Sequence, residues 1–192
     1  MTLISIIPPE NAKGVVKQGY EMFMKSIGMI PKPMEMLSAS PALFESQLDR
    51  IRYFGKHPTL SFALLLHIRY MASCMLNYGF CQNFNQRLLK KLGLTDADIR
   101  TLEIDPSKAL LEEHEKAILE FVLKSMKSPN SIGKQDIKTL RNFGWNDRDM
   151  IDALAQGVNM IDHSIMMQVF QIDKECTVPT TMSQWFWQNR LL

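Results

Sequence analysis

The side chains best suited to chemistry lie in the most apolar stretch of the chain, residues 60–94. They are His67, Cys74, Tyr78, Cys81 and Asn85. A cysteine thiolate is a nucleophile, and an imidazole or phenol beside it is able to donate or accept the proton of its reaction. We therefore take this stretch as the candidate site, with Cys81 as the candidate nucleophile.

The local backbone decides which of these residues face one another. Residues seven apart return to nearly the same side of a helix, so one unbroken helix would align His67, Cys74 and Cys81. Asn77 and Gly79 instead favour a break, because such residues commonly end one helix before another begins. A break places Cys81 in the first turn of a new helix, where the helix dipole lowers the pKa of a thiol. The sequence leaves both arrangements open.

Six short motifs are spread over most of residues 15–173. They are GMIP at 28–31, SPALF at 40–44, YGFCQNFN at 78–85, LGLTDADI at 92–99, EKAIL at 115–119 and GWNDRD at 144–149. Together they resemble the alkylhydroperoxidase D-like, or carboxymuconolactone decarboxylase, family. The resemblance implies an all-α fold, the alkylhydroperoxidase D-like helical bundle. It also implies assembly as a homo-oligomer, a trimer or hexamer, with the cysteine region near a subunit boundary.

Three of the four groups in that family's thiol relay are replaced in this chain. Carried over by position, the second cysteine of the family's Cys-x-x-Cys motif falls on Cys81 and the first falls on Tyr78. The motif histidine falls on Asn85, and the family's acidic residue falls on Leu66, next to His67. The resemblance thus implies a thiol site centred on Cys81 with an altered relay.

Two functions from different classes follow. The first is a peroxiredoxin-like thiol peroxidase with an antioxidant role, in which Cys81 attacks a peroxide and Tyr78 or His67 moves the proton. Cys74 or a small thiol would then resolve the sulfenic acid. The second is an oligomeric scaffold that has kept the fold and lost the relay, and that binds a small apolar ligand or a protein partner. In the second case Cys81 is a small buried hydrophobe.

The composition is that of an ordinary globular chain. Its 192 residues, 46% hydrophobic and 22% charged, are enough for one domain with a buried core. We expect one domain over 1–192, with an N-terminal arm at 1–14 and an aromatic tail at 177–192. A net charge of +2 gives no sign of nucleic-acid binding. The apolar run at 60–66 is far shorter than the roughly 20 residues of a membrane span.

The cysteine count bears on compartment and on metal chemistry. Three cysteines do not suggest a disulfide framework and favour a reducing compartment, so we expect a cytoplasmic protein. The spacing of His67, Cys74 and Cys81 is not that of a known metal site. The chain also has no glycine-rich phosphate loop, and we expect neither a metal nor another cofactor.

The rest of the chain predicts the helices that hold this stretch in place. Helical spacing and capping residues predict helices at 15–27, 34–38, 41–54, a short one from 96, 105–126, 137–143 and 147–169. Thr59 is the expected cap of the central run and Asn146 that of the last helix. Glu115 is expected on a solvated face. His163 is either a buried histidine bonded to a carbonyl or a polar group facing Cys81.

Overall fold

A computed structural model describes residues 2–77 and 79–172 of the chain. Within these residues the regular backbone consists of α-helices and short 3-10 helices, with no strand, which confirms the predicted all-α fold. The described residues form two compact units, one containing residues 2–58 and 165–172 and the other residues 59–164. No helix in the described part of the chain is long and apolar enough to cross a bilayer.

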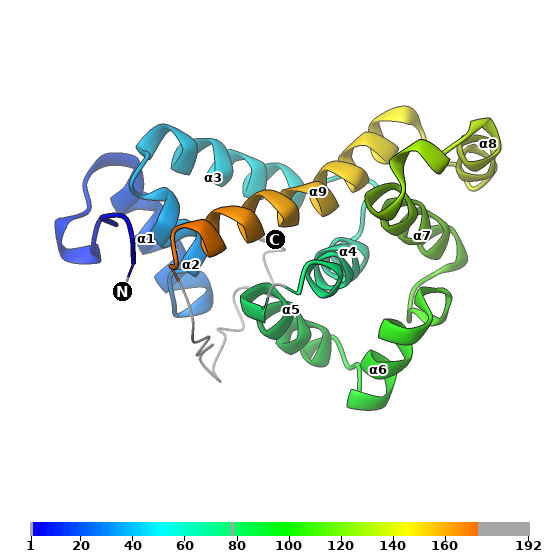
Figure 1. Cartoon of the computed structure of the whole chain (residues 1–192), viewed down its shortest axis with the longest axis horizontal. Helices are drawn as coiled ribbons and strands as arrows, with labels where there is room; N and C mark the ends of the chain where they lie inside the picture. The colour runs from blue at the N-terminus through cyan, green and yellow to red at the C-terminus, as the bar shows by residue number, and fades with distance from the viewer. Residues whose placement is uncertain (1, 78, 173–192) are drawn as a thin grey trace. The chain divides into compact units, whose positions relative to one another are not determined.

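The first unit is built on α3. Its helices are α1 (Gly14–Ile27), α2 (Lys32–Leu37) and α3 (Pro41–Gly55), preceded by a 3-10 turn at Pro9–Asn11. Both α1 and α2 pack against α3 (Figure 1). Gly19 allows α1 to approach α3 closely, because a Cβ there would overlap the Phe44 ring and lie 3.0 Å from Leu48 Cδ1. The prediction began α2 two residues late, since Pro33 fits the first turn of a helix, where no N–H is needed.

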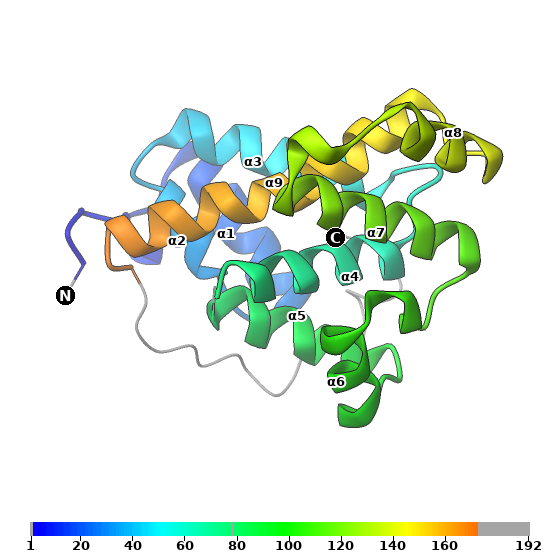
Figure 2. The ribbon, with the colours of Figure 1, turned by 45° about the vertical axis from the view of Figure 1, so that its right-hand side comes forward.

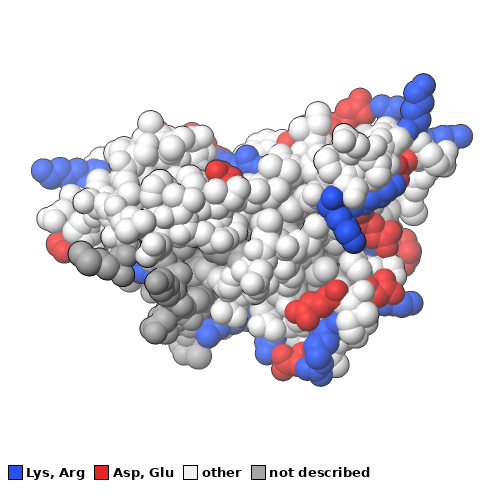
Figure 3. Space-filling view, in the orientation of Figure 1, with Lys and Arg blue, Asp and Glu red and all other residues white. Residues whose placement is uncertain are grey.

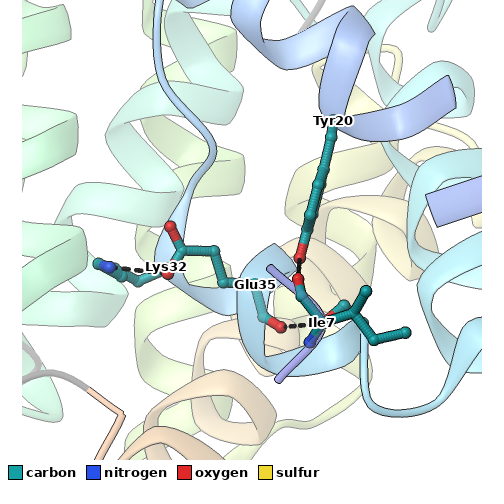
Figure 4. A network of polar contacts seen from close by, with 5 residues as sticks. Ile7, Tyr20, Lys32 and Glu35 are labelled. Carbon is teal, nitrogen blue, oxygen red and sulfur yellow. Dashed lines mark hydrogen bonds and ion pairs between the residues drawn. The ribbon is translucent and has the colours of Figure 1, made fainter. Parts of the chain in front are cut away.

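A polar network ties the segment before α1 to α1 and α2 (Figure 4). The Tyr20 hydroxyl donates to the Ile7 carbonyl at 2.9 Å, and the Ile7 N–H donates to Ser38 Oγ at 2.8 Å. The Ser38 hydroxyl in turn donates to the Glu35 carbonyl at 2.6 Å, and Lys32 forms an ion pair with Glu35 at 2.7 Å. Burial raises the pKa of Tyr20, so its hydroxyl remains a donor at neutral pH.

The second unit is built around α4. Its helices are α4 (Phe62–Met75), α5 (Gly79–Lys91), α6 (Asp96–Ile104), α7 (Glu113–Lys127) and α8 (Lys134–Asn142), with 3-10 turns at Pro106–Lys108 and Pro129–Ser131. In both ribbon views α4 lies between α5 and α7 (Figures 1 and 2). Helix α6 packs on α5, and α8 packs on α7. The sequence around the candidate nucleophile therefore forms the centre of this unit.

Helix α4 is buried on every side. All its residues from Leu64 to Ser73 are buried, which is the pattern of a helix inside a core. Its N-cap is Ser61, whose Oγ accepts from the Leu64 N–H at 3.0 Å. The prediction that Thr59 caps this helix was wrong. The Thr59 hydroxyl donates to the buried Asp149 carboxylate at 2.5 Å instead.

Helix α7 begins later than predicted. The proline at 106 starts only a 3-10 turn, and Ala109 has extended backbone that stops it from continuing into an α-helix. A new helix starts after Glu112, whose N–H donates to Glu115 Oε2 at 3.4 Å. This contact helps to draw Glu115 inward. The side chain expected on a solvated face is only 8% exposed.

Many charged residues on α6, α7 and α8 lie at the surface. Figure 3 shows acidic and basic side chains interspersed over α6, α7 and α8. The ion pairs here are Lys116–Glu113 at 2.8 Å, Lys124–Asp136 at 2.6 Å and Arg141–Asp147 at 2.8 Å. Exposed pairs of this kind contribute little to stability, because solvent screens them. The buried charged residues of the unit are therefore the better guide to a functional site.

The last helix, α9 (Asp147–Val169), begins as predicted. Asn146 caps it, with its Oδ1 accepting from the Asp149 N–H at 3.0 Å. Gly157 lets this helix approach α7 closely, because a Cβ there would lie 2.7 Å from Met126 Sδ and 2.8 Å from Val122 Cγ1.

One face of α9 is apolar and exposed. Ile151 is 67% exposed, Val158 45%, Ile165 56% and Val169 57%. Its buried positions include smaller or more polar residues, namely Ala153, Gln156, His163 and Ser164, beside Met150, Met160 and Met167. The helix therefore has a second apolar face that the described chain leaves in contact with solvent.

Candidate functional site

The helical stretch is interrupted between α4 and α5, and this interruption determines where Cys81 lies. Helix α4 ends at Met75, Asn77 has a positive φ of 50°, and α5 begins at Gly79. The alternative of one unbroken helix is wrong. Cys81 lies in the first turn of α5, where the helix dipole favours a thiolate over a thiol. The predicted site residue Tyr78 lies outside the described residues.

A buried arginine lies near Cys81. Arg69 of α4 is only 7% exposed, and burial lowers its pKa to about 10, while the negative charge of a Cys81 thiolate acts in the opposite direction. The interaction is reciprocal, so the Arg69 cation favours the thiolate form of Cys81. Cys81 itself is 6% exposed. A guanidinium and a helix N-terminus thus both stabilise negative charge on this sulfur.

Asn85 holds Arg69 in this place. Its side-chain Oδ1 accepts from Arg69 Nε at 3.3 Å, and its Nδ2 donates to the Cys81 carbonyl at 2.8 Å. The Arg69 guanidinium also lies 5.9 Å from the centre of the Phe62 ring. Its Nη2 is buried and has no hydrogen-bond partner in the described chain. Asn85 is therefore a positioning residue, and one guanidinium N–H group remains available.

The predicted site residue His67 faces a different neighbour. Its Nδ1 donates to the Ala63 carbonyl at 2.8 Å, which leaves Nε2 as the acceptor of the neutral ring. Burial lowers the pKa of His67, and the Ala63 hydrogen bond and the charge of Glu115 on α7 partly counter this effect. Nε2 is buried without a hydrogen-bond partner among the described residues. The hydrogen bond of His67 is thus within α4, and the charge that acts on its ring comes from α7, which packs against α4.

Cys74 belongs to a third polar group. It lies close enough to Tyr70 for that side chain to affect its pKa, and the Tyr70 hydroxyl donates to Glu103 of α6. Burial raises the pKa of Cys74 to about 11, although the Tyr70 hydroxyl lowers it in part. Burial and the Glu103 hydrogen bond also raise the pKa of Tyr70. Cys74 is therefore a protonated thiol at neutral pH.

Helix α4 thus sends polar side chains to three neighbours. Arg69 faces α5, His67 faces α7, and Tyr70 with Cys74 faces α6. Of the five predicted site residues, Cys81 and Asn85 are brought together, while Cys74 and His67 make other contacts. Sequence reasoning missed Arg69, although a cation inside an apolar run was a usable signal, because a buried charge requires a partner.

Two other features predicted from the sequence concern His163 and metal binding. His163 of α9 is 5% exposed, and its role stays a prediction. In the ranges that the structure covers, no three His, Cys, Asp or Glu side chains gather as a potential metal site.

Comparison with known proteins identifies the fold. No protein-family model matches the chain, and no curated protein matches it significantly in sequence. A peroxidase-related protein with an alkylhydroperoxidase AhpD core, from Ralstonia eutropha JMP134, is similar over 98% of this chain and 96% of its own, with a TM-score of 0.76 and 16% identity. A peroxidase-related protein from Silicibacter sp. TM1040 is similar over 92% and 93%, with a TM-score of 0.72 and 16% identity. The chain has the AhpD-like helical fold, which confirms the resemblance at the level of the fold.

Proposed function

We propose that this protein is a thiol-dependent peroxide reductase in which Cys81 is the reacting residue. The observation that carries the proposal is that Asn85 bonds both to Arg69 Nε and to the Cys81 carbonyl, which holds the guanidinium near Cys81 in the first turn of α5. Both features favour the thiolate, which is the form that attacks peroxides. The similar proteins are themselves described as peroxidase-related, which supports the same reaction class.

Arg69 offers a replacement for part of the lost relay. The family's motif histidine falls on Asn85, an amide that does not titrate. Here Asn85 accepts from Arg69 Nε and so fixes a permanent cation near the sulfur. Activation of Cys81 then requires no general base at position 85. His67 and Tyr78 stay predictions as proton-transfer residues.

The proposed reaction is a two-electron oxidation of sulfur. The Cys81 thiolate attacks one oxygen of a hydroperoxide, the S–O bond forms and the O–O bond breaks. The leaving alkoxide or hydroxide takes a proton from water, which gives an alcohol or water. A small thiol then attacks the sulfenic acid, releasing water and forming a mixed disulfide, and a second thiol restores Cys81. We expect the reduced thiols of a cytoplasm to supply this reductant.

A sulfenic-acid trap tests the proposal directly. Reduced protein is treated with one equivalent of hydrogen peroxide and a sulfenic-acid trap, and the adduct is located by mass spectrometry. We expect labelling at Cys81, retained in Cys74→Ser and lost in Cys81→Ser. If Cys81 remains unlabelled under conditions that label a free cysteine peptide, the protein is not a thiol peroxidase at this residue.

The exposed face of α9 favours a second role, self-association. Ile151, Val158 and Ile165 are each seven residues apart, and Leu154 and Ile161 fall between them at the spacing of a coiled-coil seam. We propose that this face binds the same face of a second copy of the chain, in a homo-oligomer. Two helices with the same seven-residue apolar repeat pack against each other along their apolar seams.

Sedimentation tests the assembly. We expect the protein to sediment as an oligomer and Val158→Asp to shift it toward the monomer, because a charge would be buried at the seam. Asp162→Asn, a change at an exposed polar position of the same helix, serves as the control. An unchanged mass for Val158→Asp would contradict this use of α9.

A further inference from the structure

The guanidinium of Arg69 has a buried nitrogen, Nη2, that meets no hydrogen-bond partner in the part of the chain that the structure describes. Arg69 is 7% exposed, its Nε bonds to Asn85, and Nη2 is buried without an acceptor in the described residues. Buried polar groups are nearly always hydrogen-bonded, and an unmatched donor on a cation is costlier than one on a neutral group. Such a donor suits a bound ligand that brings its own acceptor.

The chemistry of the donor specifies the ligand. A guanidinium matches a carboxylate in geometry and charge, and a hydrogen bond between ionised groups is about twice as strong as a neutral one. A small carboxylate bound to Nη2 would supply the missing acceptor.

We infer that Arg69 Nη2 binds the carboxyl group of a small acid beside Cys81, and that the peroxides reduced there are peroxycarboxylic acids. This inference rests on the proposed function. The Cys81 thiolate attacks the terminal oxygen of the peroxy group, an S–O bond forms, and the O–O bond breaks. The sulfur keeps the OH as sulfenic acid and is oxidised by two electrons, and a carboxylate leaves. Nη2 donates to this carboxylate as its charge develops.

Two alkylating reagents test the binding site without any peroxide. Iodoacetate and iodoacetamide both form an S–C bond and release iodide, but only iodoacetate carries a carboxylate. The ratio of their rates at Cys81 cancels the fraction of thiolate and isolates recognition of the carboxylate. We expect the ratio to exceed that of a free cysteine peptide by about tenfold or more, the scale of one charge-assisted hydrogen bond.

Variants locate the effect at Arg69. We expect Arg69→Met to reduce the ratio to that of the free peptide, and Arg69→Lys to retain part of it, since lysine keeps the charge but not the planar fork. Arg100→Met, which removes an exposed guanidinium on α6, is the matched control and should leave the ratio unchanged. On the unmodified protein, sodium acetate should lower the ratio more than sodium chloride at equal ionic strength. The acetate experiment uses the unmodified protein, so it does not depend on whether a variant folds.

The substrate class is tested by comparing peracetic acid with hydrogen peroxide in the oxidation of Cys81. We expect Arg69→Met to lower the ratio of these two rates by about tenfold, since the lost hydrogen bond acts on the leaving carboxylate. An alkylation ratio equal to that of the free peptide and unaffected by acetate would overturn the carboxylate site. Labelling of Cys81 by peroxide would then still support the proposed function, so the two failures are distinguishable.

Discussion

Asn85 accepts a hydrogen bond from Arg69 Nε at 3.3 Å, across the contact between α5 and α4. The two residues are distant in sequence, and their contact fixes a guanidinium that interacts with the charge of a Cys81 thiolate. An amide in this position neither gains nor loses charge with pH. The hydrogen bond that holds Arg69 therefore does not depend on the protonation of Asn85.

Removing this cation should make Cys81 less acidic. In Arg69→Met we expect the midpoint of the alkylation rate against pH to rise by about one pH unit or more, because a nearby positive charge favours the thiolate. Asn85→Ala should give a smaller rise, since it frees the guanidinium without removing it. Iodoacetamide labelling of Cys81, followed by mass spectrometry, gives the midpoint. Equal midpoints in the unmodified protein and Arg69→Met would show that the cation does not act on this sulfur.

Cys74 should react slowly at neutral pH. Its pKa of about 11 leaves almost no thiolate there, so alkylation of Cys74 should lag far behind that of Cys81. Tyr70→Phe removes the hydroxyl that lowers this pKa, and should slow Cys74 further while leaving the Cys81 rate unchanged. Separate peptide masses distinguish the two cysteines. Faster labelling of Cys74 than of Cys81 would contradict the assignment of Cys81 as the nucleophile.

His67 should make the fold less stable in mild acid. Burial holds its folded pKa below the ordinary value of 6.5, so below that pH the unfolded chain takes up a proton that the folded chain refuses. The stabilisation is therefore complete above about pH 6.5 and is lost as pH falls through the folded pKa.

Urea unfolding at about pH 7.5 and pH 5.5 measures this loss. His67→Gln should show a smaller drop in unfolding free energy between the two values than the unmodified protein, because its side chain does not titrate. The other histidines are common to both proteins and cancel in the comparison. An identical drop in unfolding free energy in both proteins would show that the acid sensitivity comes from groups other than His67.

The two close-packed glycines should resist substitution. Gly157→Ala places a Cβ 2.8 Å from Val122 Cγ1, a group with little rotamer freedom in a helix, and should destabilise the fold by about 1–3 kcal/mol. Gly19→Ala meets the Phe44 ring and should cost a similar amount. Gly133→Ala is the matched control, since its Cβ would meet nothing within 4 Å. Thermal unfolding of the three variants checks the order, and equal melting temperatures would contradict it.

The positions of most helices could be predicted from local signals. Gly28 ends α1 in the left-handed conformation, Pro41 opens α3, and Asn146 caps α9. These residues act through their own backbone or through a contact three residues away. The error at the start of α4 has a long-range origin. Thr59 and Ser61 are both acceptable caps, and only the distant Asp149 decides between them.

The candidate site was predictable only in part. The break before Gly79 placed Cys81 in a first helical turn, because it depends on neighbours in sequence. The contact between Arg69 and Asn85 depends instead on how α4 packs against α5, which no local pattern encodes. Glu115 was placed wrongly for a different reason, because its burial follows from where α7 begins. Long-range pairing of polar residues is what the sequence alone did not reveal.

The three polar contacts of α4 also fix its rotation about its own axis. A single inserted residue in the middle of this helix would turn everything beyond it by about 100°. Leucine, isoleucine and methionine tolerate exchange with one another in such a turn, but a misdirected arginine or tyrosine does not. The charged and hydroxyl side chains therefore fix how α4 is rotated. A deletion or insertion within this helix should abolish the native arrangement even when its apolar content is preserved.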